Sequence, residues 1–201
     1  MTEPAWIRMI ADEEADATLN AVFDIARTPH GTLDNVMRVH SLRPATMTGH
    51  VTLYRSVLHS DDNTLPFWFL ETVASYVSIL NACAYSLLHH WANASRLVDD
   101  PERAEAVRAA LDVGRPEDAF EGKELALLRY AGKLTIAVGA MEKSDINALH
   151  AAGCDDGEIL EVNQVVAYFN YSNRLLNGLG VSTAGDTVGY YKEADETGES
   201  E

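Results

Sequence analysis

Apolar residues recur every three or four positions along almost the whole chain, the spacing that places them on one face of an α-helix. The segment 11–27 shows this spacing clearly, with Leu19, Val22, Phe23 and Ala26 on its apolar side. No convincing run of alternating β-branched residues, such as a strand would need, interrupts the pattern. The hydrophobic pattern therefore predicts an all-α fold.

Capping residues divide this pattern into separate helices. Short polar side chains are favoured at helix N-termini, proline in the first turn and glycine just after the end. The predicted N-caps are Thr64, Asn81, Asp100 and the capping-box pair Asp155 and Glu158. The predicted helices cover residues 11–27, 33–41, 44–60, 65–80, 82–97, 101–111, 122–136, 145–152 and 158–179, and Gly180 ends the last. Whether 65–80 and 82–97 form two helices or one bent helix stays open.

Length and composition are those of one globular domain. Of the 201 residues, 47% are hydrophobic and 23% charged, so the chain can bury a core without disulfides. We predict a single domain over residues 1–190, with its functional core at about 64–98. Residues 191–201 are acidic and lack an apolar anchor, so they are predicted to be disordered.

The charge and the cysteine content exclude several classes of protein. A formal net charge of −16 disfavours nucleic acids and anionic membranes as partners, because like charges repel. No apolar run is long enough to span a bilayer, and the N-terminus lacks the features of a signal peptide. These observations predict a cytoplasmic protein. Its two cysteines, Cys83 and Cys154, are expected to be thiols in that compartment.

The stretch NACAYSLLHH, residues 81–90, places Cys83, Ser86 and His90 within roughly 60° of one another on a helix. If Cys83 lies in the first turn, the helix dipole is expected to lower the pKa of its thiol. Glu71 lies twelve residues earlier in an otherwise apolar segment, where a carboxylate needs a partner. The opposing interpretation is that Cys83 and Cys154 are inert core residues. The histidines show no ligand spacing, so we assign no metal and no cofactor.

The pattern E-x11-C-x-Y-S-x3-H, from Glu71 through Cys83, Tyr85 and Ser86 to His90, resembles the motif of the AhpD-like alkylhydroperoxidases. These belong to the carboxymuconolactone decarboxylase superfamily. The flanking segments NVMRVHSLRP and NQVVAYFNYSNRLLNGLGV resemble its longer, peroxidase-related branch, so the resemblance covers roughly residues 30–182.

The resemblance implies an AhpD-like orthogonal multi-helix bundle, a homo-oligomer (dimer, trimer or hexamer) and thiol-dependent reduction of hydroperoxides. In two-cysteine members the second cysteine of C-x-x-C attacks the peroxide, the first resolves the sulfenic acid, and Glu and His move protons. Cys83 then matches the resolving thiol, and Glu71 and His90 match the proton relay. Ser86 stands where the attacking thiol belongs, and a serine hydroxyl cannot form a sulfenic acid.

Three hypotheses follow from that replacement. In the first, Cys83 reduces organic hydroperoxides as a one-cysteine peroxidase with antioxidant activity, Glu71, Ser86 and His90 assist it, and an external thiol regenerates it. In the second, Glu71 and His90 act as acid–base groups of a non-redox, decarboxylase-like lyase on a small lactone or related acid. In the third, the protein binds a small molecule without catalysis. The aromatic residues Phe67, Trp68, Phe69 and Trp91 favour an organic ligand.

Overall fold

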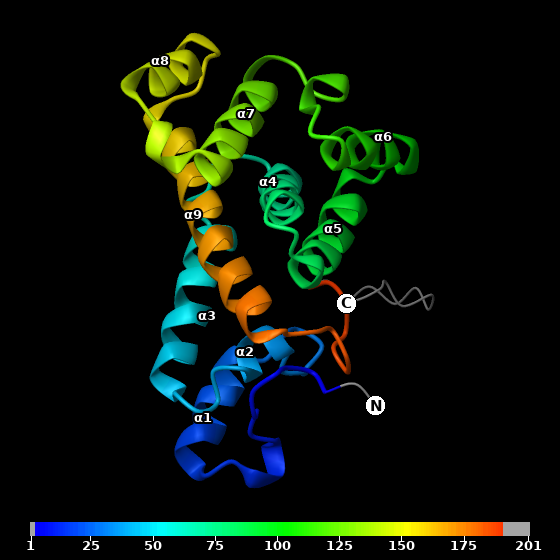
Figure 1. Ribbon diagram of the computed structural model, residues 1–201, viewed down its shortest axis with the longest axis vertical. Helices are drawn as coiled ribbons and strands as arrows, with labels where there is room; N and C mark the ends of the chain where they lie inside the picture. The colour runs from blue at the N-terminus through cyan, green and yellow to red at the C-terminus, as the bar shows by residue number, and fades with distance from the viewer. Residues whose placement is uncertain (1–2, 191–201) are drawn as a thin grey trace.

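Figure 1 shows the computed structural model, which describes residues 3–190. These residues contain helices and no strand, so the predicted all-α fold is confirmed. The helices are α1 (Ala17–Ala26), α2 (Asn35–Arg38), α3 (Pro44–Leu58), α4 (Phe67–Leu80), α5 (Ala84–Val98), α6 (Pro101–Asp112), α7 (Gly122–Ile136), α8 (Lys143–Ala151) and α9 (Asp156–Leu179). The tail predicted to be disordered, 191–201, lies outside the described residues.

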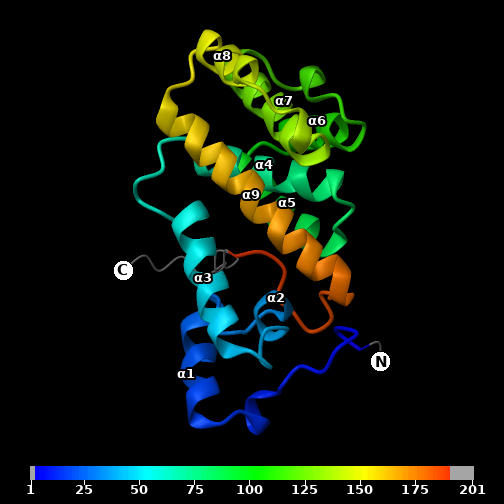
Figure 2. The same ribbon diagram turned by 60° about the vertical axis from the view of Figure 1, so that its left-hand side comes forward.

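Helix α4 is the centre of the bundle. It packs against α5, α7 and α9, and in Figure 1 it lies between α9 and α5. Its sequence FWFLETVASYVSIL is mostly apolar, and its residues from Phe69 to Ser78 are all buried. Helix α9 runs along the molecule and packs against α3, α4 and α7, as Figure 2 shows. No helix of residues 3–190 has the length and apolarity needed to cross a bilayer.

Several predicted helix ends are confirmed because short-range capping decides them. Helix α7 covers the predicted residues, Gly122–Ile136. Asp100 caps α6 by accepting from the amide of Arg103, and Asp155 with Glu158 forms the capping box of α9. Gly180 ends α9 in the left-handed conformation, with φ of 60°.

The helix starts predicted near residue 11 and at Thr64 are wrong. The expected helix 11–27 is a single 3-10 turn, Asp12–Glu14, followed by α1, because the Asp16 side chain caps the amide of Leu19. Thr64 is not the cap of α4: it lies two residues before the N-cap position, Pro66, and its amide and hydroxyl donate to Glu161 on α9. Helix α4 begins only after Pro66.

The chain breaks between α4 and α5, so these are two helices. Asn81 is the C-cap of α4 and does not cap α5. Ala82 adopts a left-handed conformation with φ of 50°, and Cys83 becomes the N-cap of α5. The turn therefore starts α5 at Ala84 and leaves Cys83 outside the helical repeat.

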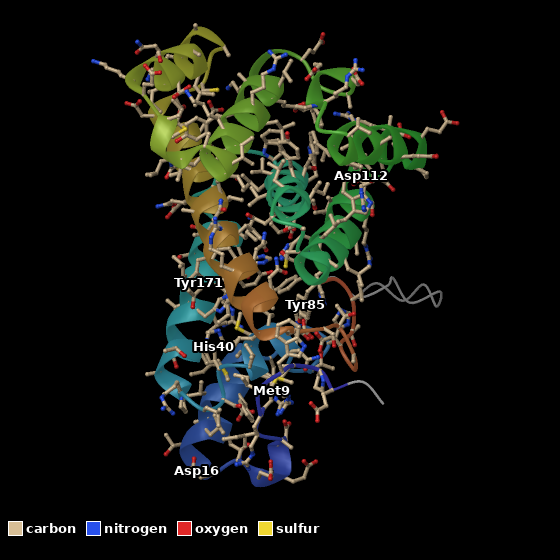
Figure 3. The ribbon with its side chains drawn as sticks, viewed as in Figure 1. Met9, Asp16, His40, Tyr85, Asp112 and Tyr171 are labelled. Carbon is tan, nitrogen blue, oxygen red and sulfur yellow. The ribbon has the colours of Figure 1, made fainter. Side chains whose placement is uncertain are left out.

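Residues 181–190 follow α9 and are called the closing segment here. Asp186 accepts the amide of Asn35 at the start of α2 (3.0 Å), and the amide of Tyr190 donates to Asn93 on α5 (2.7 Å). Figure 3 places Tyr85 of α5 beside this segment. The closing segment thus joins the N-terminal helices to α5.

We expect Gly180→Ala to destabilise the fold by about 1–2 kcal/mol, whereas Gly178→Ala should be neutral or stabilising. At Gly180 the left-handed backbone disfavours a side chain, and a methyl group would overlap the ring of Trp6. Gly178 lies within α9, and a methyl group there meets nothing within 4 Å. Urea denaturation of both variants measures the difference, and equal stability of the two would contradict this account.

Candidate active site

A cavity of about 70 Å³ lies where α5 faces α3, α9 and the closing segment. Its wall combines polar groups with an apolar surface. The polar side chains include Ser86, His89, His90 and Asn93 of α5, Tyr168 and Ser172 of α9, and Asp34; the apolar ones include Val36, Met37, Val51 and Leu176. A cavity of this size and composition suits water or a small, partly apolar organic molecule.

Glu71 is fully buried and bound on both oxygens. Its Oε2 lies 2.6 Å from Nδ1 of His90, and its Oε1 accepts the side-chain amide of Asn93 at 3.0 Å. Asn93 is itself held, because its Oδ1 accepts the amide of Tyr190. The carboxyl group that seemed isolated in sequence therefore has two polar partners from α5, and its burial is compensated.

His90 is the member of this pair that reaches the cavity. Its ring packs edge-on against Phe169, with ring centroids 4.5 Å apart, and Glu71 binds its Nδ1. Nε2 is therefore the ring nitrogen left for a ligand. An imidazole fixed in this way by a carboxylate is the arrangement that general acid–base catalysis uses.

Ser86 lines the same cavity and is tied to α4. Its Oγ lies 2.9 Å from Oγ of Ser78, which is also 2.8 Å from the carbonyl oxygen of Ala74. Ser86 is 3% exposed and lies one helical turn from His90. The hydroxyl therefore has a fixed place in the cavity wall.

Cys83 does not line the cavity, although the helical spacing predicted that it shares a face with Ser86 and His90. It is 1% exposed and packs with Ala5, Val39 and Leu176. The prediction assumed that Cys83 lies within the helix, whereas it is the N-cap and has a non-helical backbone. Helical projection does not apply to that residue.

The predicted lowering of the Cys83 pKa is also wrong. Burial raises the pKa of this thiol, and the opposing effect of the Ser86 and Tyr85 amides is smaller. Cys154 is buried too, in the main core, and burial raises the pKa of its thiol. Both cysteines are free thiols.

Three polar groups of the cavity wall gave no signal in the sequence analysis. Asn93 completes the shell around Glu71, and His89 lies beside it in the wall. Asp34 faces the cavity, where burial and the nearby charge of Asp186 raise its pKa to about 7. His89 lies at an unassigned position inside the motif and Asn93 lies three residues beyond it, so only a helical projection of the whole stretch 86–93 could have found them.

A chain of hydrogen bonds leads from the cavity into the N-terminal half. Tyr168 bonds Nε2 of His50, and Nδ1 of His50 lies 2.8 Å from Nε2 of His40, which Figure 3 labels. Nδ1 of His40 lies 3.0 Å from Oγ of Thr46. Burial, with the nearby His40, lowers the pKa of His50 to about 3, so this histidine is neutral near pH 7.

Other candidate groups lie elsewhere. No group of histidine, cysteine and acidic residues within 3–190 could hold a metal ion. The aromatic residues expected to flank the site do not line the cavity; Phe67, Trp68, Phe69 and Trp91 belong to or pack against the main core.

Solved structures provide the comparison, since no family model and no curated protein matches the chain. An uncharacterized peroxidase-related protein from Silicibacter sp. TM1040 is 24% identical, with a TM-score of 0.76 over 90% of this chain and 92% of its own. The alkylhydroperoxidase AhpD core protein from Ralstonia eutropha JMP134, also described as peroxidase-related, is 18% identical, with a TM-score of 0.78 over 91% and 94%. The chain has the AhpD-like fold.

A further structure similar to this chain contains a small ring compound. The debrominase Bmp8, as a cysteine-to-alanine variant in complex with 2,3,4-tribromopyrrole, is 16% identical, with a TM-score of 0.70 over 87% of this chain and 89% of its own. The AhpD-like fold predicted from the motif is thus confirmed. Identity at this level shows the fold and leaves the reaction to the residues of the cavity.

Proposed function

We propose that this AhpD-like protein is an enzyme of the carboxymuconolactone decarboxylase superfamily that acts on a small organic molecule by acid–base catalysis. The observation that carries the proposal is the buried Glu71 carboxyl group, which holds His90 at the wall of a cavity. Of the residues singled out in the motif, Tyr85, Ser86 and His90 line that cavity, and Glu71 binds His90 directly. Cys83 is turned into the core.

His90 would transfer the proton. Because Glu71 holds Nδ1, Nε2 can take a proton from the ligand or return one, and the adjacent carboxyl group stabilises the imidazolium that forms. Asn93 keeps Glu71 in place by occupying its other oxygen. Ser86 would offer its hydroxyl to the bound molecule as a hydrogen-bonding group, since nothing beside it activates it as a nucleophile.

The ligand is expected to be small and partly apolar. The volume of about 70 Å³ limits its size, and side chains such as Val51 and Leu176 match a carbon ring or short chain. Binding of tribromopyrrole to the Bmp8 variant supports a ring compound in a protein of this fold.

A one-cysteine peroxidase is the second candidate. Cys83 stands at the N-terminus of α5, where helix amides favour a thiolate, and two similar structures are described as peroxidase-related. It would require an external thiol reductant and access of the hydroperoxide to a side chain that is 1% exposed. The burial of Cys83 and the raised pKa of its thiol make the peroxidase the weaker candidate.

The test compares variants on panels of small lactones, ketones and organic hydroperoxides, including cumene hydroperoxide. For a compound that is turned over, we expect His90→Gln and Glu71→Gln to lower kcat/KM by about 10²- to 10⁴-fold. Cys83→Ala should stay within about twofold, because no reacting atom is expected to touch the thiol. Cys154→Ala is the matched control for loss of a buried thiol.

Two results would overturn the proposal. The first is rapid oxidation of Cys83 by cumene hydroperoxide to a sulfenic acid that dimedone traps. If Cys83→Ala also loses turnover of the hydroperoxide, the protein is a peroxidase. Absence of turnover on all panels, together with a small molecule that copurifies with the protein, would establish a binding protein without catalysis.

A further inference from the structure

His89 lines the cavity and has a buried ring nitrogen without a hydrogen-bond partner among residues 3–190. The residue is 8% exposed, and its ring stacks on Tyr85 with centroids 4.8 Å apart. Nδ1 accepts the amide of Gly189 at 3.4 Å, so in the neutral ring the proton is on Nε2. Burial lowers the pKa of His89 to about 4, so the ring is neutral near pH 7. Nε2 makes no hydrogen bond within the described chain.

The carboxyl group of Asp186 lies near this nitrogen but is bound to other groups. Oδ2 of Asp186 lies 3.8 Å from Nε2 of His89, beyond hydrogen-bonding distance. That oxygen accepts the hydroxyl of Tyr85 at 2.5 Å and the amide of Asn35 at 3.2 Å, and these contacts hold it where it is. A buried N–H donor without an acceptor costs free energy, and an oxygen of a bound molecule would remove that cost.

The surrounding charges favour a neutral oxygen. Asp186 lies close to His89. The charge of Asp186 also raises the pKa of the nearby Asp34 carboxyl group. An anionic ligand oxygen would meet the negative charge of Asp186, whereas a carbonyl oxygen accepts a hydrogen bond without bringing a charge. His90, the next residue of α5, lines the same cavity.

We infer that Nε2–H of His89 binds the carbonyl oxygen of a small, neutral ligand whose remaining atoms lie against His90. This inference deepens the proposed function, on which it rests, because it names the ligand class of the same cavity. It assigns His89 the role of a binding and orienting residue.

The test compares two molecules of the same shape, cyclopentanone and methylenecyclopentane, of which only the ketone can accept a hydrogen bond. Their dissociation constants are measured by NMR titration of the wild-type protein and of His89→Phe, which keeps a ring against Tyr85. We expect the ratio of the ketone constant to the alkene constant to rise about tenfold in His89→Phe. His89→Gln retains an N–H donor and should restore most of the preference. His150→Phe, on the surface of α8, is the control.

A second readout uses the wild-type protein alone. The ¹⁵N signals of His89 should report a proton on Nε2, and ketone but not alkene should shift that signal. An unchanged ratio in His89→Phe, an Nε2 signal indifferent to ketone, or failure of both molecules to bind would overturn the inference. His90→Gln should keep the ketone preference. If His90→Gln also kept the full turnover of the wild type, the proposed function would be overturned and the inference about His89 would stand.

Discussion

Replacing His90 by alanine is expected to destabilise the protein by about 3 kcal/mol or more, a large effect for one partly exposed side chain. The loss comes from Glu71, which is fully buried and would keep Asn93 as its only polar partner. A buried carboxyl group that loses its partner is costly because the interior cannot replace water.

The same substitution in a Glu71→Gln background should cost only about 1 kcal/mol, because the neutral amide does not need the imidazole to offset a charge. The free energies of unfolding of the four proteins, from urea denaturation, form a double-mutant cycle whose coupling energy measures the pair. His150→Ala, an exposed histidine, should change stability by less than about 0.5 kcal/mol. Equal losses from His90→Ala in both backgrounds would mean that the pair contributes no coupling.

Asp34→Asn is expected to stabilise the protein at pH 8 by about 2–4 kcal/mol and to leave stability unchanged below pH 4. Burial and the charge of Asp186 raise the pKa of Asp34 to about 7, above its ordinary value. Between pH 4 and 7 the unfolded chain therefore releases this proton while the folded protein keeps it. Stability falls as pH rises through that interval, and asparagine removes the loss.

The measurement is the difference in unfolding free energy between wild type and variant from pH 4 to pH 8. Asp12→Asn is the control of opposite sign, because the hydrogen bond from Arg27 lowers the pKa of Asp12. Its variant should lose stability above pH 4 relative to wild type. A pH-independent difference for Asp34→Asn would show that its carboxyl group titrates normally.

Local chemistry explains what the sequence could predict about the fold. The bounds of α7 and the caps at Asp100 and Asp155 depend on residues within one helical turn, so a single sequence contains the information. Thr64 was predicted as a cap, but α4 begins only after Pro66, and the amide and hydroxyl of Thr64 donate to Glu161, far along the chain. A hydrogen bond to a side chain so distant in the sequence cannot be predicted from the local pattern.

Some residues of the candidate site could be predicted from local spacing, and others could not. The spacing of Glu71, Ser86 and His90 places them together because all three lie on adjacent packed helices. The left-handed turn at Ala82 removed Cys83 from that face, and nothing in an alanine marks such a turn. Neither the raised pKa of Asp34 nor the position of its neighbour Asp186, on the closing segment, can be read from spacing.

The closing segment joins parts of the chain that are synthesised far apart in time. Asp186 binds the amide of Asn35, 151 residues earlier, and Ser182 binds the carbonyl of Pro4, 178 residues earlier. Closing such long loops costs conformational entropy, so we expect these contacts to form after the local ones. Until residues 189 and 190 are in place, Nδ1 of His89 lacks the amide of Gly189 and Oδ1 of Asn93 lacks the amide of Tyr190, so this part of the cavity wall is added last.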